Sequence, residues 1–436
     1  MMKWSPVRWR SLAIKTAIFV AVIIMLEIAF TKTSIPSSLK ILPKPAFGKA
    51  YPLPPTDIEI RPGAISMMIV GDSLSQGGEG DWTWRYRLWE WFRREEVMVD
   101  FVGPFLGTRP QAVPALNTET LPEPVGIPPV GGAVISTAGY ALDVSPDFNP
   151  RHFAAVGRAI WEIIPLMAAQ VARYQPTYML ILLGFNDMAW SLYTEAEVVA
   201  HMLDLVTLAR SAKPDIKFAI GNVPLRAPLD EPLTIRTDLY NKLLAEAIPT
   251  WGTEDSPVIP VLMRESYSCG GDGCPAGHDG LHPATLGDFE IAHAFSRALI
   301  DGYGLGTTEL DVPGPWDLPV RPIAIPSNIR TVADGKGVNV TWDMFYGARG
   351  YDVQSRVVGE DVWIQWKTQQ ENEFFLRWPA EEALEMEFKV RMSHGKQEKG
   401  EWSRAIGSCR PWSSLSTREK WDWRWWFRRI WTCSWR

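Results

Sequence analysis

The chain has 436 residues, of which 46% are hydrophobic and 22% are charged, and its formal net charge is -6. This length exceeds that of one ordinary folded core, so we expect two folded units with additional terminal segments. The composition is that of a globular protein, and the mildly negative charge argues against nucleic acid as a partner.

An apolar run near the N-terminus predicts entry into the secretory pathway. Residues 16–26 carry no charge and follow several basic residues, which is the layout of a signal peptide or a signal anchor. The run is shorter than the roughly 20 residues that span a bilayer comfortably, so a cleaved signal, a retained anchor and a buried helix all remain open. We assign residues 1–30 to this segment and residues 31–56, which are rich in Pro, Ser and Lys, to a linker. A secreted or membrane-anchored protein is therefore expected, with any membrane association at this end.

Residues 57–305 alternate between apolar runs and amphipathic stretches. Strands are expected at residues 65–70, 97–102, 177–183, 216–220 and 258–262. Helices are expected at residues 82–94, 153–173 with an interruption at Pro165, 195–212, 234–248 and 285–299. This alternation predicts an α/β domain whose parallel sheet is covered by helices on both faces. Residues 105–132, rich in Pro and Gly, are expected to form a long loop of the kind that serves as a lid or binding loop.

The pattern changes beyond this domain. A Pro-rich linker at residues 306–322 leads into residues 323–410, where short strand-like runs are separated by turns. Strands are expected there at residues 338–342, 350–357, 362–366, 388–392 and 403–407. Such spacing predicts a small all-β sandwich. Residues 411–436 interleave Trp with basic residues, which fits a helix in a membrane interface and a disordered tail equally well.

Four cysteines suit an oxidising compartment. Cys269 and Cys274 enclose a glycine-rich stretch, Gly-Gly-Asp-Gly, that favours a small disulfide ring. Zinc is the weaker alternative, because no further Cys or His follows at finger spacing. Cys409 and Cys433 could pair with each other, and the pattern leaves this open.

The apolar run at residues 65–70 stops at Gly-Asp-Ser-Leu, which places the hydroxyl of Ser73 at the carboxyl end of a buried strand. Open α/β sheets carry their chemistry at this end. Ser73 is therefore a candidate nucleophile, although a serine here could instead cap the following helix.

Three other segments could supply the partners of such a nucleophile. Asn186 follows the strand at residues 177–183, where its carboxamide could donate to an oxyanion. Asp279 precedes His282 by three residues in one loop, so the carboxylate could orient the imidazole as a general base. Gly139 lies in the loop between the second and third strands and could offer a backbone N–H.

Each of these residues has a plainer explanation. Asn186 could be a turn former. His278, Asp279 and His282 lie close enough in the sequence to make a metal site conceivable, but no ligand from another strand end completes it. Trp82 and Trp190 could line an acyl or sugar pocket, and the alternative is that they pack in the core. We expect no metal and no cofactor.

These blocks, in this order, resemble those of the SGNH hydrolases, also called GDSL esterases and lipases. The motifs are Gly-Asp-Ser-Leu, Gly-x-Asn-Asp and Asp-x-x-His-Pro, and the resemblance covers residues 64–300. It implies a flavodoxin-like three-layer fold in which Ser73 attacks an ester carbonyl, His282 is the base and Asp279 orients it. The oxyanion donors would be the amides of Ser73 and Gly139 and the side chain of Asn186.

Residues 323–409 resemble a fibronectin type III domain. The resemblance is carried by Trp342, by Tyr351, and by the Phe-Lys-Val-Arg-Met run that begins at Phe388. Such modules bind partners or act as spacers, so contact with carbohydrate or a cell surface is expected through this region. Asn339 starts a glycosylation sequon inside an expected strand.

The sequence thus predicts a serine esterase that acts on acetylated polysaccharide or short-chain esters. A lipase or phospholipase acting on lipid esters is the first alternative. An inactive SGNH-like protein that presents the β module for adhesion is the second, and the presence of Ser73, Asn186, Asp279 and His282 together speaks against it.

Overall fold

The structure, a computed structural model, describes residues 60–110, 138–271, 273–378, 385–396 and 398–409. All of them belong to one compact unit of the chain, residues 48–436. The expected signal segment and its linker, most of the expected loop at residues 105–132, and the Trp-rich tail lie outside the described residues. Within the described part of the chain, no helix is both long and apolar enough to cross a membrane.

A parallel sheet forms the centre of the α/β domain, as expected from the sequence. Its strands are β1 (Ile65–Gly71), β2 (Val99–Val102), β3 (Phe153–Ala154), β4 (Tyr178–Leu182), β5 (Lys217–Gly221) and β6 (Val258–Val261). The strand order is β2-β1-β4-β5-β6, and the short β3 pairs with the carboxyl end of β1. The strand β1 is therefore central, and its carboxyl end meets the ends of β3 and β4.

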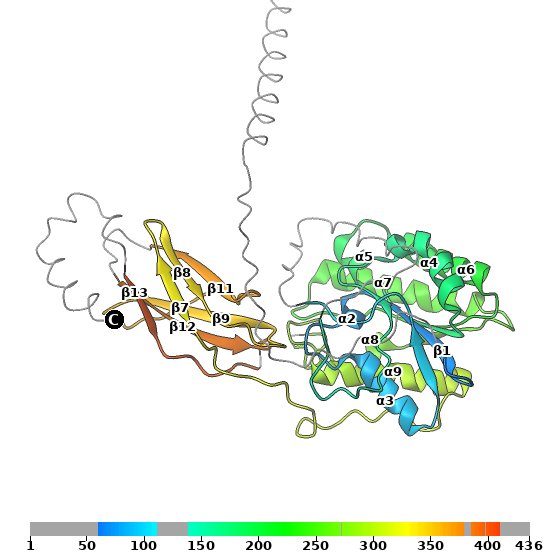
Figure 1. The fold of residues 1–436 in the computed structure, drawn as a ribbon. Coiled ribbons are helices and arrows are strands. Elements are labelled where there is room, and N and C mark those ends of the chain that lie inside the picture. The colour runs from blue at the N-terminus through cyan, green and yellow to red at the C-terminus, as the bar shows by residue number, and fades with distance from the viewer. Residues whose placement is uncertain (1–59, 111–137, 272, 379–384, 397, 410–436) are drawn as a thin grey trace, which may run out of the picture. The chain divides into compact units, whose positions relative to one another are not determined.

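Helices cover both faces of this sheet (Figure 1). One face carries α3 (Thr83–Arg94) and α9 (Thr285–Tyr303), and the other carries α4 (Ile160–Tyr174), α6 (Glu195–Ala212) and α7 (Glu231–Ala247). The side chains of β1 alternate between two separate cores, with Met67 on the α3 side and Met68 on the α4 side, and both are fully buried. This burial on both faces explains why the strand reads as a continuous apolar run.

The structure corrects the helix that we expected at residues 153–173. Phe153 is fully buried and pairs with Val70 as part of β3, so α4 begins only at Ile160. Pro165 lies inside α4 without ending it. A proline removes one backbone hydrogen bond, and the buried apolar face that includes Ile163 and Met167 outweighs this loss.

Residues 330–409 form an antiparallel β region with its own core. One sheet has the order β10-β9-β12-β13 and the other β11-β8-β7. The strands are β7 (Arg330–Ala333), β8 (Gly337–Thr341), β9 (Gly350–Val357), β10 (Ile364–Gln365), β11 (Glu373–Arg377), β12 (Glu385–Ser393) and β13 (Ile406–Cys409). Trp342 and Tyr351 pack edge to face in this core, with ring centroids 5.2 Å apart. Sequence reasoning missed β7 and β11, whose short runs mix exposed polar and apolar residues.

Candidate active site

Ser73 lies where the sequence places it, two residues beyond the end of the central strand β1. It is the first residue of the short helix α2 (Ser73–Gln76), and the preceding Asp72 caps this helix by accepting a hydrogen bond from the Leu74 amide at 2.9 Å. Because Asp72 performs the capping, the Ser73 hydroxyl is not engaged in it. The plainer explanation of Ser73 as a helix cap is thus not supported.

The hydroxyl of Ser73 is connected to a histidine and a carboxylate. Its Oγ lies 3.0 Å from Nε2 of His282, and Nδ1 of the same ring lies 2.7 Å from Oδ2 of Asp279. An ionised carboxylate can only accept, so Nδ1 carries the ring proton and Nε2 is left to accept from the serine hydroxyl. The structure therefore brings Ser73 to Asp279 and His282, although Ser73 and His282 are 209 positions apart in the sequence.

The electrostatics of the pair suit a general base. Partial burial acts to lower the pKa of His282, but the charge and hydrogen bond of Asp279 outweigh it and raise this pKa above its ordinary value. Burial acts to raise the pKa of Asp279, yet the charge of His282 and its hydrogen bonds hold it far below the usual range. Asp279 therefore stays ionised and stabilises the protonated form of the imidazole.

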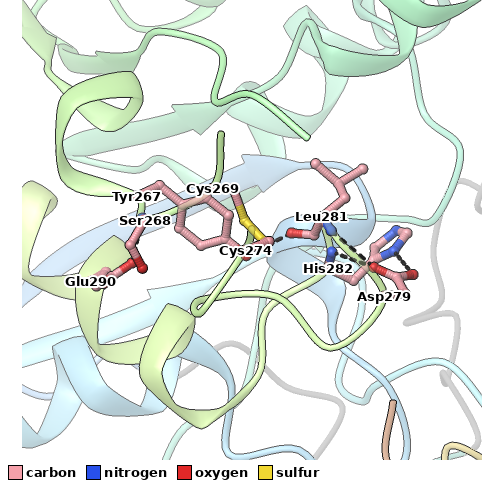
Figure 2. Close-up of a disulfide and its surroundings, with 8 residues drawn as sticks. All are labelled: Tyr267, Ser268, Cys269, Cys274, Asp279, Leu281, His282 and Glu290. Atoms are coloured by element: carbon pink, nitrogen blue, oxygen red, sulfur yellow. Dashed lines mark hydrogen bonds and ion pairs between the residues drawn. A yellow bond between two sulfur atoms is a disulfide. The ribbon is translucent and has the colours of Figure 1, made fainter. Parts of the chain in front are cut away.

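The loop that carries His282 is held by several independent contacts. Cys269 and Cys274 form the disulfide that their spacing predicts, and Figure 2 shows it beside Tyr267 and the histidine loop. The Tyr267 hydroxyl donates to the carbonyl oxygen of Leu281 at 2.6 Å. Asp279 Oδ1 also accepts from the backbone amide of His282 at 2.9 Å. These contacts fix the loop conformation that presents the imidazole to Ser73.

A glycine is required in the same loop. Gly280 has a φ of +101°, and a Cβ built on it would lie 2.0 Å from the carbonyl oxygen of Ala227. Its own carbonyl oxygen accepts from the Ala227 amide at 2.8 Å. Only glycine permits this backbone conformation together with this close approach.

Asn186 lies beside the site, but both hydrogens of its carboxamide are engaged. Its Nδ2 donates to Oδ2 of Asp72 at 3.3 Å and to the carbonyl oxygen of Arg158 at 2.9 Å. Burial raises the pKa of Asp72 to about 7, although the Leu74 amide opposes this shift. To serve an oxyanion, Asn186 would have to release one of these two acceptors. Its role as an oxyanion donor stays a prediction.

Gly139 lies in the loop between β2 and β3. Its carbonyl oxygen accepts from the Gly80 amide at 3.1 Å and from Oγ1 of Thr108 at 2.9 Å. A Cβ on Gly139 would lie 2.6 Å from the Tyr346 hydroxyl, which gives a packing reason for glycine here. The predicted use of its backbone amide also stays a prediction.

A cavity of about 420 Å³ opens at Ser73 and His282. From the α/β domain it is lined further by Arg109, Val156, His278 and Asp279, among others. From the β region it is lined by Arg349, Thr368, Gln370, Lys396 and Lys399. Sequence reasoning found neither Arg109 nor the residues of the β region, because no local motif marks a side chain that reaches a site through tertiary contacts.

The two tryptophans proposed as pocket residues do not line this cavity. Trp82 is 4% exposed, belongs to the core on the α3 side, and donates from Nε1 to Asp143 at 2.7 Å. Trp190 is half-buried at the end of the short helix α5 (Phe185–Trp190). The structure therefore favours the alternative that Trp82 is a core residue. Among the described residues, no three His, Cys, Asp or Glu side chains are grouped to hold a metal ion.

Part of this chain matches the model of a known family. The model of the GDSL-like Lipase/Acylhydrolase family matches residues 133–288, a range that contains Gly139, Asn186, Asp279 and His282 and begins after Ser73. A comparison with curated proteins finds no match.

Several solved structures are similar to part of this chain. A family 3 carbohydrate esterase from Talaromyces cellulolyticus is 20% identical, with a TM-score of 0.38, and the match covers 54% of this chain and 97% of that one. A family 3 carbohydrate esterase from Clostridium thermocellum is 19% identical with a TM-score of 0.39, and the coverage is 55% and 96%. An acetyl-xylooligosaccharide esterase from Geobacillus is 12% identical with a TM-score of 0.36, and the coverage is 57% and 99%.

Proposed function

We propose that this chain, whose residues 133–288 match the model of the GDSL-like Lipase/Acylhydrolase family, is a serine esterase and that its nucleophile is Ser73. His282 is the general base of this mechanism, and Asp279 is its orienting carboxylate. One observation carries the proposal, namely the continuous hydrogen bonding from Ser73 Oγ to His282 Nε2 at 3.0 Å and from His282 Nδ1 to Asp279 Oδ2 at 2.7 Å.

The reaction proceeds in two steps that use the same residues. Ser73 Oγ attacks the ester carbonyl carbon as Nε2 of His282 takes the hydroxyl proton, and the imidazolium then returns this proton to the departing alcohol. Water next attacks the acyl-serine, with His282 accepting a proton from water and giving it to Ser73 Oγ as the acid leaves. Asp279 remains ionised throughout and stabilises the imidazolium. The residues of this scheme require no metal and no cofactor.

The negative charge that develops on the carbonyl oxygen needs donors. We propose the backbone amides of Ser73 and Gly139 and the carboxamide of Asn186 for this role. Asn186 would exchange its hydrogen bond with Asp72 for one with the oxyanion, and Asp72 lies beside it with a pKa raised by burial to about 7. A partly protonated Asp72 loses little when Asn186 turns away, because a neutral carboxyl is a weaker acceptor than a carboxylate.

Acetylated carbohydrate or another short-chain ester is the proposed substrate. The cavity wall includes polar and charged side chains, among them Arg109, Gln370 and Lys396, whose chemistry suits hydrogen bonding to a hydroxylated compound. An ester of a lipid is the alternative.

We further propose that the β region is a fibronectin type III-like module and that the protein enters the secretory pathway. The two antiparallel sheets of four and three strands support the first proposal. The disulfide between Cys269 and Cys274 supports the second, because disulfides persist in oxidising compartments.

Turnover of p-nitrophenyl acetate by the wild type and by Ser73→Ala tests the esterase mechanism. We expect the substitution to lower kcat by about 10^4, because the acyl-enzyme cannot form. Equal rates for the two proteins would overturn the proposal. A panel that compares acetylated xylo-oligosaccharides with p-nitrophenyl esters of rising chain length then separates the carbohydrate from the lipid assignment.

A further inference from the structure

The β region contacts the loop that carries the catalytic histidine. The amide of Lys396 donates to the carbonyl oxygen of His278 at 3.3 Å, and the His278 amide donates in turn to the carbonyl oxygen of His282 at 2.9 Å. The neighbouring Gly395 approaches so closely that a Cβ built on it would lie 2.1 Å from the His278 carbonyl oxygen. The turn that follows β12 therefore packs directly against the backbone of the catalytic loop.

A buried ion-pair cluster anchors this contact. Asp81, which precedes α3, accepts from Arg321 and, at 2.8 Å, from Nη2 of Arg349. Burial acts to raise the pKa of Asp81, but the charges of Arg349 and Arg321 outweigh it and hold this pKa far below the usual range. The Arg349 guanidinium also donates to the carbonyl oxygen of Pro283 at 3.0 Å. Removing one partner of a buried ion pair destabilises the fold, because the remaining charge loses its compensation away from water.

Two side chains of the β region line the cavity with unused hydrogen-bonding groups. Gln370 and Lys396 are exposed, and neither the carboxamide nor the ammonium group has a hydrogen-bond partner among the described residues. Their neighbours differ in this respect, because Lys399 donates to Asp352 at 3.2 Å and Thr368 donates to the same carboxylate at 2.8 Å. Gln370 and Lys396 are therefore available to a ligand that enters the cavity beside Ser73.

We propose that the β region forms one wall of the substrate cavity and that Gln370 and Lys396 determine specificity by binding the alcohol part of the ester. A carboxamide and an ammonium group that share a cavity with the nucleophile suit the hydroxyl and ring oxygens of a sugar. The proposal rests on the esterase function proposed above and assigns the recognition of its carbohydrate to the second structural region. The β region is then part of the catalytic unit, in addition to any contact that it makes with an outside partner.

The test compares a substrate that reaches the wall with one that does not fill the cavity. We would measure kcat/KM of the full chain with an acetylated xylo-oligosaccharide and with p-nitrophenyl acetate. For Gln370→Ala combined with Lys396→Ala, we expect kcat/KM for the acetylated xylo-oligosaccharide, divided by kcat/KM for p-nitrophenyl acetate, to fall about tenfold or more. The change should come chiefly from a higher KM for the oligosaccharide. Each single substitution should produce part of this change. Lys367→Ala is the matched control, because Lys367 is exposed in the same segment but does not line the cavity, and it should leave the ratio unchanged.

The outcomes separate this inference from the esterase proposal. An unchanged ratio in the double variant, or an equal loss with both substrates, would overturn the recognition role of Gln370 and Lys396. Ser73→Ala supplies an independent measurement, since calorimetric binding of the acetylated xylo-oligosaccharide needs no turnover. In that background the double substitution should weaken binding about tenfold. If Ser73→Ala instead kept full esterase activity, the proposal that Ser73 is the nucleophile would fail. The binding measurement would still decide whether Gln370 and Lys396 bind the oligosaccharide.

Discussion

The guanidinium of Arg349 donates to Asp81 at 2.8 Å and to the carbonyl oxygen of Pro283 at 3.0 Å, so one side chain links the start of α3 to the residue that follows His282. We expect Arg349→Ala to lower the free energy of unfolding by about 1.5 to 3 kcal/mol, because it removes one of the two arginine partners of a buried carboxylate and Arg321 remains. It should also lower kcat/KM, since the carbonyl oxygen of Pro283, next to the proposed general base His282, loses a donor.

Chemical denaturation and steady-state kinetics check this expectation. Arg356→Ala is the control, because Arg356 lies on β9, the strand that Arg349 precedes, and pairs with Glu387 at 2.7 Å, but it does not line the cavity. If both variants had the same effect on kcat/KM, the hydrogen bond from Arg349 to the carbonyl oxygen of Pro283 would make no contribution to catalysis.

Two glycines of the β region test the contact with the catalytic loop. Gly395 and Gly359 both have a positive φ, +124° and +93°, so alanine strains the backbone at either position. Only at Gly395 would the new Cβ meet the His278 carbonyl oxygen, whereas nothing lies within 4 Å at Gly359. We therefore expect Gly395→Ala to reduce esterase activity well beyond Gly359→Ala. Similar activities for the two variants at matched stability would contradict a close contact in solution.

The raised pKa of His282 predicts the acid limb of the pH profile. His282 must be neutral to accept the proton of Ser73, so activity is lost as the pH falls through its pKa, which Asp279 holds above the ordinary value of 6.5. In Asp279→Asn the carboxylate charge is absent, and we expect the limb to move to lower pH while kcat falls by about 10^4. The measurement is kcat/KM against pH for both proteins. A limb that stayed in place would show that another group controls it.

Asn186 distinguishes an oxyanion donor from a structural residue. We expect Asn186→Ala to lower kcat by roughly 10^2 to 10^3 with little change in KM. Stability should fall by only about 1 to 2 kcal/mol, because the substitution removes hydrogen bonds to Asp72 and Arg158. Asn241→Ala is a suitable control, since Asn241 makes two hydrogen bonds with the backbone of Val223 and does not line the cavity. A loss of stability in both variants with kcat preserved in both would make Asn186 structural.

The disulfide between Cys269 and Cys274 should stabilise the catalytic loop only modestly. The two residues are 5 positions apart. A ring of this size constrains the unfolded chain by about 2 kcal/mol in the loop-entropy account. We expect a reductant to lower the Tm of the wild type by more than it lowers that of a variant with serine at both positions. An equal effect of reductant on both proteins would assign the stabilisation to another cysteine pair.

The sequence by itself determined the α/β domain and pointed to the residues of the proposed catalytic centre. The apolar run that ends at Ser73 and the short spacing between Asp279 and His282 are local features, and parallel strands bring their carboxyl ends to one edge. The strands expected at residues 65–70 and 177–183 agree with β1 and β4 to within one or two residues.

Only the tertiary structure decided what surrounds that centre. In the structure Trp82 is a core residue, and α4 continues through Pro165. Arg349 and Lys396 contact the loop that carries His282. Arg349 and Asp81 are 268 positions apart, so no periodicity or motif can report their contact. Local patterns in the sequence indicate which residues are buried and where strands end. Contacts between residues far apart in the chain depend on how the folded elements pack and where their charges meet.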